Sequence, residues 1–331
     1  MKNFIESAGI DISKLTIDVY LHQMRIHRQF ANNRSGYKML LKWICSLKLN
    51  PGEVLFCFEH TGWYCILLSY YLHDRGLYYC CVNPIEIKRS IGLKRNKTDK
   101  DDAYYIAHYA WLRRDELKAS SPPPVKIIEL QRMMSLREQL VKQSTALKNL
   151  RKAMEQLVSS PSNDLSVIAL DQTLQYLKKQ VLRIEKEMEK LINSDESMGK
   201  NYKLSRTVKG VGTVLAVQML LHTHNYSRFN SWRQFSSYCG LVPCQYQSGT
   251  SIHGRARGHP ISDRKMKSLL SMAAISAVQW DQELKEYYQS RVEKGKPKML
   301  VLNIIRNKLV SRIFATVKRG TAYAEIKMIA A

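Results

Sequence analysis

Three short apolar stretches separated by polar turns open the chain, at 4–11, 15–22 and 25–30. The tripeptide Ile12-Ser13-Lys14 is the polar turn between the first two stretches. Stretches of this length with tight connections are typical of neighbouring strands that run in opposite directions. We therefore expect an antiparallel meander of three strands at the N-terminus.

After residue 30 the spacing of apolar residues alternates between helical and strand-like. It predicts helices over 36–47, 63–75 and 99–112 and buried strands over 54–59 and 77–82. Three strands followed by alternating strand and helix is the element order of the ribonuclease H-like α/β fold, so we expect that fold here. The order of elements does not by itself fix a function.

A proline-rich break at 120–124 precedes two long heptad patterns. Apolar residues step by three and four from Met133 to Leu157, with a polar exception at Gln143, and again from Val167 to Leu191. Each pattern predicts a helix roughly 45 Å long. We expect the two helices to form an antiparallel coiled-coil hairpin. Folding back into a helical bundle and pairing with another protomer both remain open.

The last 131 residues are predicted to form short helices and loops, and they are strongly basic, with 21 Lys and Arg against six Asp and Glu. The changes of pattern divide the chain into three segments, 1–120, 121–196 and 197–331. The predicted fold class is α/β for the first segment and all-α for the rest.

Net charge narrows the class of partner. The 331 residues include 52 Lys and Arg against 28 Asp and Glu, which gives a formal charge of +24. A localised basic excess is typical of proteins that bind nucleic acid. The chain has no run of apolar residues long enough to span a bilayer, so no membrane partner is expected. The N-terminus lacks a secretory pattern, which favours a cytoplasmic protein.

The seven cysteines form an odd set with no Cys-x-x-Cys pair. This spacing argues against both a disulfide framework and a structural zinc site. We expect the cysteines to be buried as small hydrophobic side chains.

Four carboxylates stand where the predicted fold brings them together. Asp11 ends the first strand, Glu59 ends the fourth, and Asp99 and Asp102 share one face at the start of a helix. Carboxylates in one cluster repel each other unless a cation neutralises them. Mg²⁺, or Mn²⁺, suits such oxygen ligands, and a two-ion site stabilises the attacking and leaving oxygens of phosphodiester displacement. Taken singly, each acid is better explained as a surface charge or a helix cap.

A run of basic residues flanks the acidic cluster, comprising Lys88, Arg89, Lys94, Arg95, Lys97 and Lys100. Such a run draws a phosphate backbone towards a metal site. A solvated basic loop is the alternative explanation.

Two glycine-containing motifs follow in the basic C-terminal segment. Gly210 and Gly212 precede an apolar helix, where backbone N–H groups can approach a phosphate, although a tight turn explains them equally well. A loop over 246–258 is rich in Gly, Ser and Arg. In it, Ser248 is a candidate nucleophile towards a phosphodiester, with Arg255 and Arg257 to offset developing charge. From chemistry alone, most such serines only form turns.

Together these motifs resemble the DEDD transposases of bacterial insertion sequences, a group that includes the pilin-gene invertase and recombinases guided by a bridge RNA. The matching segments are Gly9-Ile10-Asp11, Glu59-His60-Thr61-Gly62-Trp63-Tyr64, Val82-Asn83-Pro84, Arg95-Asn96-Lys97-Thr98-Asp99 with Asp102-Ala103, Gly210-Val211-Gly212, Gly240-Leu241-Val242-Pro243, and Tyr246 with Ser248-Gly249. They follow the family's order from residue 9 to about 260. His60 replaces a residue that is commonly small in relatives, and Lys100-Asp101 adds an acid that points off the shared face.

The resemblance implies a RuvC-type N-terminal domain whose catalytic acids are Asp11, Glu59, Asp99 and Asp102. It also implies a C-terminal transposase domain in which Ser248 attacks DNA to form a covalent phosphoserine. Relatives look like dimers of dimers that combine the acids of one protomer with the serine of another, so a dimer or tetramer assembled through the coiled coil is expected. The implied partners are donor and target DNA and a noncoding bridge RNA, in a bacterial cytoplasm at the nucleoid.

Two other interpretations remain from the sequence. One is a junction-resolving nuclease that hydrolyses DNA with metal-bound water and uses no serine. The other is a basic architectural or RNA-chaperone protein whose acids only balance charge. A covalent protein–DNA adduct distinguishes the recombinase from the nuclease, and sensitivity to chelation of divalent metal distinguishes either enzyme from the architectural protein.

Overall fold

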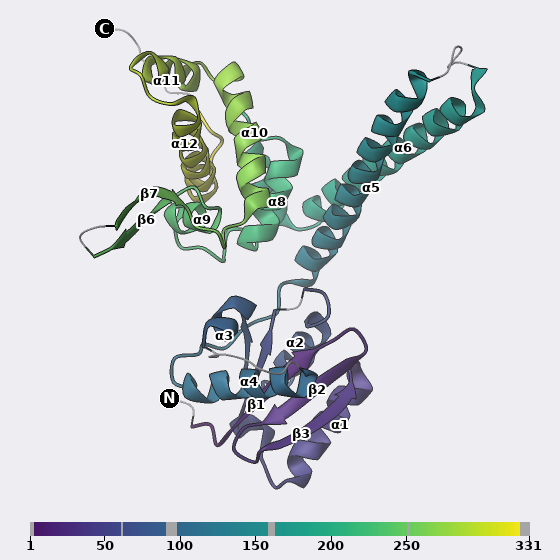
Figure 1. Cartoon of the computed structure of the whole chain (residues 1–331), viewed down its shortest axis with the longest axis vertical. Helices are drawn as coiled ribbons and strands as arrows, with labels where there is room; N and C mark the ends of the chain where they lie inside the picture. The colour runs from purple at the N-terminus through teal and green to yellow at the C-terminus, as the bar shows by residue number, and fades with distance from the viewer. Residues whose placement is uncertain (1–2, 61, 91–97, 158–162, 250–251, 325–331) are drawn as a thin grey trace. The chain divides into compact units, whose positions relative to one another are not determined.

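A computed structural model describes residues 3–60, 62–90, 98–157, 163–249 and 252–324. The chain divides into two units, Met1–Pro122 and Pro123–Ala331, each with its own hydrophobic core. Within the described ranges, no helix is long and apolar enough to cross a membrane. The first unit is mixed α/β and the second is almost entirely helical (Figure 1).

A five-stranded sheet with the order β3-β2-β1-β4-β5 is the centre of the first unit. Its strands are β1 (Glu6–Ile12), β2 (Thr16–Leu21), β3 (Ile26–Ala31), β4 (Val54–Glu59) and β5 (Tyr79–Val82). The first three strands form the antiparallel meander that the sequence predicts, while β4 and β5 run parallel to β1. The parallel pairing places the C-terminal ends of β1 and β4 side by side.

Helices cover both faces of this sheet (Figure 1). On one face, α1 (Arg34–Ser46) and α2 (Ile66–His73) contribute to the main core with the side chains of Ala8, Ile10, Phe56 and Phe58. On the other face, α4 (Asp99–Leu112) and α3 (Pro84–Ser90) pack over Leu55 and Cys57. The short 3-10 helix η1 (Pro51–Glu53) leads into β4. Alternate residues of each strand therefore belong to opposite layers.

Gly9 permits α4 to lie directly on β1. A Cβ atom at this position would stand 2.1 Å from the backbone nitrogen of Ala107 and 2.3 Å from the carbonyl oxygen of Ala103. Ser7, on the same face, donates its hydroxyl to the carbonyl of Ala107 at 2.9 Å. The helix backbone is therefore held against the strand two residues before Asp11.

The second unit begins with two long helices, α5 (Val125–Glu155) and α6 (Leu165–Asn193), which pack against each other antiparallel (Figure 1). The ion pairs Arg137–Glu185 and Arg151–Asp171 join the two helices. Residues later in α5 pair with residues earlier in α6, as an antiparallel arrangement requires. Asp164 caps α6 by accepting hydrogen bonds from the backbone N–H groups of Ser166 and Val167. The lengths of α5 and α6, 31 and 29 residues, agree with the heptad patterns.

The base of this helix pair belongs to the core of the second unit. Ile127, Leu130, Met134, Met188 and Ile192 are buried with side chains from the C-terminal helices. These helices are α7 (Glu196–Arg206), α8 (Thr213–Thr223), α9 (Trp232–Tyr238), α10 (Arg264–Trp280), α11 (Gln282–Glu293) and α12 (Lys298–Arg319). The strands β6 (Pro243–Ser248) and β7 (Ile252–Gly258) form a hairpin between α9 and α10.

The expectation of a loop over 246–258 is wrong. Strands β6 and β7 pair antiparallel there, with a register irregularity between Cys244 and Tyr246. Glycine and serine weaken the strand signal, but backbone pairing between two adjacent segments tolerates them. The expectation that all cysteines are buried is also wrong, because Cys45 and Cys244 are exposed.

Candidate active site

Two carboxylates stand at neighbouring strand ends on the face of the sheet that α4 covers. In the parallel pairing of β1 with β4, Gly9 lies opposite Cys57 and Ile10 opposite Phe58. Side chains alternate along a strand, so Asp11 shares the face of Gly9, and Glu59 shares the face of Cys57. The register thus brings the two acids to the same end and the same side of the sheet.

The first turn of α4 supplies the other two predicted acids. Thr98 is the N-cap, and its hydroxyl accepts a hydrogen bond from the backbone N–H of Asp101. Asp99 and Asp102 are three residues apart and so lie on one face of the helix. Asp101 accepts the hydroxyl of Thr98 at 2.7 Å, which holds it apart from that pair. Thr98 therefore fills the capping role that Asp99 could have had.

The charges of the other three predicted acids act on Asp11. The pKa of Asp11 is raised from 3.8 to about 6 by burial and, next, by the charges of Asp102, Asp99 and Glu59. Burial and like charge both disfavour the ionised form of a carboxyl group. This oxygen-only set fits a hard divalent cation. Even so, among the residues that the structure describes, no three His, Cys, Asp or Glu side chains surround a common point, so a metal would require rotation of these side chains.

Asp18 is a fifth acid that the sequence analysis did not select. It lies opposite Asp11 in the β1–β2 register, it is 5% exposed, and its charge also raises the pKa of Asp11. Its carboxylate oxygens lie 2.8 Å from His27 Nε2 and 3.0 Å from the donating Gln29 Nε2. The available signal was a charged residue inside an apolar strand that pairs with the strand of Asp11.

The predicted basic residues near this cluster are only partly described. Lys88 and Arg89 are exposed in the last turn of α3. Lys94, Arg95 and Lys97 lie outside the described residues. Lys100 is exposed in the first turn of α4. The structure therefore places three of the six predicted basic residues on the surface.

The predicted serine nucleophile belongs to the second unit. Ser248 is the last residue of β6 and pairs with Ile252, the first residue of β7. Gly249 follows with φ +57°, a conformation that glycine adopts without strain. Arg255 and Arg257 both lie on β7. The hairpin thus carries all three residues, with the serine near its turn.

The two glycines before α8 have different surroundings. Gly210 has φ +89°, and a Cβ there would stand 2.6 Å from the carbonyl oxygen of Ala273 on α10. Close packing and the turn conformation account for this glycine. Gly212 is the N-cap of α8, and a Cβ would meet no atom within 4 Å. Only Gly212 therefore leaves open space at the start of the helix.

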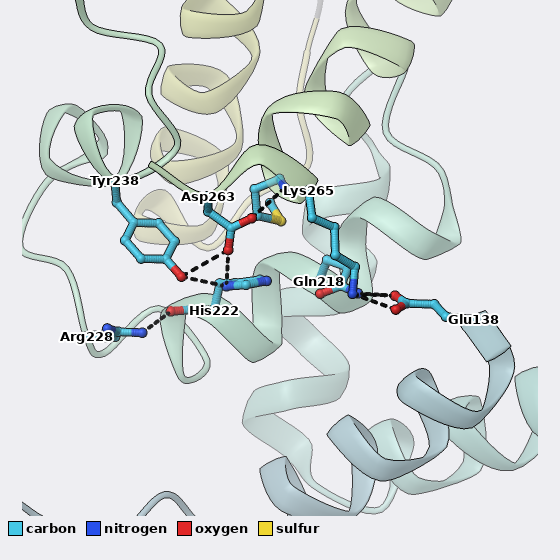
Figure 2. Close-up of polar contacts among 8 residues, drawn as sticks. Glu138, Gln218, His222, Arg228, Tyr238, Asp263 and Lys265 are labelled. Atoms are coloured by element: carbon cyan, nitrogen blue, oxygen red, sulfur yellow. Dashed lines mark hydrogen bonds and ion pairs between the residues drawn. The ribbon is translucent and has the colours of Figure 1, made fainter. Parts of the chain in front are cut away.

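A cluster of three polar side chains lies at the root of the hairpin (Figure 2). Tyr238, at the end of α9, donates its hydroxyl to Asp263 at 3.1 Å, and the same hydroxyl lies 3.1 Å from His222 Nδ1. Asp263 is the N-cap of α10, and its backbone N–H donates to the carbonyl of Tyr238 at 3.0 Å. The cluster therefore ties together the chain that enters the hairpin and the chain that leaves it.

Burial dominates the electrostatics of this cluster. It lowers the pKa of His222 despite the opposing charge of Asp263, so the neutral imidazole is favoured. It also raises the pKa of Tyr238 to about 12, and the charge of Asp263 adds to this shift. The phenol consequently stays protonated and acts as a hydrogen-bond donor at neutral pH. In the sequence, Tyr238 lies two residues before the motif that begins at Gly240.

Further contacts fasten the hairpin root and the helices beside it. Lys267 Nζ donates to the carbonyl of Gly240 at 3.0 Å, while a Cβ on Gly258 would stand 2.7 Å from that same oxygen. On α5, Glu138 accepts hydrogen bonds from Gln218 on α8 and Lys265 on α10, as Figure 2 shows. The serine hairpin therefore projects from a fixed base.

Comparison with known proteins gives the family. A transposase model of the DEDD IS110 type matches residues 8–159, and the model of the IS116/IS110/IS902 transposase family matches residues 202–289. The first match covers all four acids and the second covers the serine hairpin. The chain belongs to the IS110 family of DEDD transposases.

Curated relatives agree with this assignment. The pilin gene-inverting proteins of Moraxella bovis and Moraxella lacunata are each 26% identical over 321 residues, which span 95% of this chain and 96% of the relative. The transposase of insertion element IS1111A from Coxiella burnetii is 23% identical over 227 residues, or 62% of this chain and 60% of the relative. The protein is accordingly a DNA transposase or recombinase, and DNA is its partner.

Proposed function

We propose that this protein is a site-specific recombinase in which a divalent metal held by Asp11, Glu59, Asp99 and Asp102 assists attack on DNA by Ser248. The observation that supports the proposal is the placement of the acids: Asp11 and Glu59 end neighbouring parallel strands on the face that α4 covers, and Asp99 and Asp102 lie at the start of that helix. Carboxylates repel in such a cluster, and a cation removes that cost. Bound there, Mg²⁺ or Mn²⁺ would stabilise negative charge on the attacking and leaving oxygens.

The chemical step conserves phosphodiester bonds. The Ser248 hydroxyl loses its proton as its oxygen bonds to phosphorus, and the bond from phosphorus to one deoxyribose oxygen breaks. The released deoxyribose hydroxyl takes up a proton. A second strand's hydroxyl then attacks the phosphoserine, which reforms a DNA phosphodiester and frees the serine. No external energy source is needed, because each bond broken is replaced by one of the same kind.

We assign the parts of this reaction to three segments. Segment 1–120 is a ribonuclease H-like, RuvC-type domain that supplies the acids, and segment 197–331 is the transposase domain that supplies the serine. Segment 121–196 is a coiled coil that joins protomers into a dimer or tetramer, so that the acids of one protomer meet the serine of another. The residues that hold phosphate backbones are Lys88, Arg89, Lys94, Arg95, Lys97, Arg255 and Arg257, and Gly212 at the start of α8 offers a further backbone contact.

A noncoding bridge RNA is the second nucleic-acid partner in this proposal. Base pairing between this RNA and both DNA partners would supply sequence specificity, while the basic protein surface holds backbones without reading bases. The proposal is supported by the formal charge of +24, which favours a polyanionic partner. RNA that copurifies in high salt, with one defined length, is the expected observation.

The test is the trapping of covalent protein–DNA adducts under denaturing conditions. Wild-type protein with Mg²⁺ is expected to form them, and Ser248→Ala is expected to form none while still binding DNA. Ser268→Ala, an exposed serine on α10, is the matched control and should behave as wild type. Asp11→Asn should lose cleavage and retain nucleic-acid binding.

Other results would favour the competing interpretations. Cleavage without any adduct, unchanged by Ser248→Ala, would indicate a junction-resolving nuclease that uses metal-bound water. DNA binding that has no associated strand cleavage, and that does not respond to chelation of divalent metal, would indicate an architectural protein. Adducts that persist in Ser248→Ala would remove the serine from its proposed role.

A further inference from the structure

Four ring side chains with nearly parallel planes form a row beside the predicted metal acids, three of them on α4 and one, His22, just after β2. Tyr104 stacks on His108 with ring centroids 5.9 Å apart and planes 14° apart. The ring centroids of His108 and His22 are 5.2 Å apart with planes 27° apart, and those of His22 and Trp111 are 5.8 Å apart with planes 19° apart. The Arg114 guanidinium continues the series 4.4 Å from the Trp111 ring. We call these five side chains the aromatic column.

The column is a surface feature. Each of its rings is partly exposed, in contrast to Ala103, Ile106 and Ala107, which are the buried residues of the same helical turns. His22 Nε2 lies 3.0 Å from His108 Nδ1, and this in-plane hydrogen bond holds the two imidazoles edge to edge, so that neither ring covers the face of the other. The planar groups are therefore already ordered before any ligand arrives.

We propose that the aromatic column binds unpaired bases of a DNA strand and leads that strand to the acids of the first unit. Tyr104 is two residues from Asp102 and lies at the end of the column nearest the acids. From Tyr104 to Trp111 the helix rises roughly 10 Å at 1.5 Å per residue, which equals about three nucleotides at 3.4 Å spacing. This inference depends on the proposed function in one respect: it takes the bound strand to be the DNA that the recombinase cleaves.

Chemistry favours a nucleic-acid strand over a protein partner. Stacking on aromatic and guanidinium planes accepts every base, because every base has a π-face. The turn beside His22 carries the exposed Arg25, a cation near the path of a backbone phosphate. A surface that binds unpaired bases would suit a position beside a site that cleaves phosphodiesters.

The strand must be unpaired to use this surface. In a duplex the faces of interior bases are occupied by their neighbours, so only terminal or extruded bases can stack on a side chain. Strand cleavage and exchange expose unpaired ends next to the broken bond. The column would hold such an end close to the acids between cleavage and rejoining.

The experiment measures equilibrium binding of a fluorescent 12-nucleotide single strand, dT12, to the full chain in EDTA, where no cleavage occurs. Tyr104→Leu removes the ring but retains apolar volume, and Trp111→Ala removes the largest ring. Each is expected to weaken binding by about 5- to 150-fold, the effect of losing one stacked base. Tyr104→Phe retains the ring and should bind as wild type.

Three controls keep the result specific. Tyr176→Ala removes a tyrosine that is 60% exposed on α6, and it should leave the affinity unchanged. The dependence of affinity on salt should not change in Tyr104→Leu, because no charge is lost. A blunt 12-base-pair duplex should not discriminate between Tyr104→Leu and wild type. Circular dichroism and thermal melting verify that each variant is folded.

An unchanged affinity of folded Tyr104→Leu and Trp111→Ala for dT12 would overturn the proposal, as would an equal loss in Tyr176→Ala. A loss seen with a single-stranded RNA but not with dT12 would also overturn it, since the occupant would then be the guide. The affinity for dT12 is measured in EDTA and does not involve the serine, so Ser248→Ala should bind dT12 as tightly as wild type. Failure of adduct formation and failure of base stacking are therefore separately visible.

Discussion

The charge cluster around Asp11 predicts that one substitution stabilises the metal-free protein while removing its response to metal. Asn has nearly the same shape as Asp but no charge, so Asp11→Asn removes both the cost of burying a charge and the repulsion from Asp102, Asp99 and Glu59. The variant should therefore unfold at a higher temperature than wild type in EDTA at pH 7. It should gain nothing further from added Mg²⁺.

The magnitude follows from the pKa shift. A rise from 3.8 to about 6 corresponds to about 3 kcal/mol at 1.36 kcal/mol per unit. Since the carboxyl group is only half-buried, solvent screening reduces this to roughly 1–2 kcal/mol. For a unit of this size the corresponding rise in Tm is roughly 4–7 °C.

The pH dependence has a definite sign. The folded state binds the Asp11 proton more tightly than the unfolded state, so wild-type stability falls as pH rises from about 4 to 6. The advantage of Asp11→Asn should be full above pH 6 and should vanish below about pH 4. With Mg²⁺ the order reverses, because the ionised cluster binds the cation and the variant lacks one ligand.

Differential scanning calorimetry at several pH values, with EDTA or Mg²⁺, measures these effects. Asp101→Asn is the matched control, since it removes a neighbouring acid bonded to Thr98 instead of a proposed ligand. That control should keep the full Mg²⁺ response. The reasoning is refuted if Asp11→Asn is less stable than wild type in EDTA at pH 7, or if both variants lose the metal response alike.

Three further outcomes follow from local geometry. Gly9→Ala should lower the free energy of unfolding by about 3 kcal/mol, because the new methyl group overpacks against the α4 backbone. Gly212→Ala should lower it by less than about 1 kcal/mol. Urea unfolding measures both changes. The lowered pKa of His222 means that the second unit loses stability as pH falls below 6.5, and His222→Asn should flatten that dependence in thermal melts. Glu138→Gln should speed amide exchange at the α8 and α10 contacts by weakening the bonds from Gln218 and Lys265, with a loss below about 1 kcal/mol.

Much of the first unit was predictable from periodicity because its strands are long enough to show it. The expected strand over 54–59 and the expected helix over 99–112 match β4 and α4. The expected helix over 63–75 is shorter in the structure, Ile66–His73. Gly62, with φ +68°, and the turn after it delay the start of that helix.

The acids were predictable for a different reason, namely that they end regular elements. A strand end and a helix start are visible in sequence, and their side-chain directions follow from simple geometry. Asp18 was missed because its importance depends on which residue pairs with it across β1 and β2. Register of this kind is a tertiary property, and one sequence does not display it.

The cluster of His222, Tyr238 and Asp263 was missed for a similar reason. Its members come from the end of α8, the end of α9 and the cap of α10, and only folding brings them together. The hairpin between α9 and α10 was hidden by its composition, since glycine and serine are more common in loops than in strands. Backbone pairing of β6 with β7 is independent of those side chains.

Helix α4 carries two of the acids and most of the aromatic column, and it packs directly on β1 at Gly9. Gly9 allows the helix backbone to sit on β1, and that contact sets how far Asp102 stands from Asp11. The same helix carries Tyr104 two residues after Asp102. The contact at Gly9 therefore also sets how far the aromatic column lies from the sheet. A substitution that lifts α4 should therefore weaken both metal-dependent stabilisation and dT12 binding. Substitutions within the column should weaken dT12 binding and leave the metal-dependent stabilisation unchanged. If a substitution that lifts α4 affected only one of the two properties, α4 would not be their common scaffold.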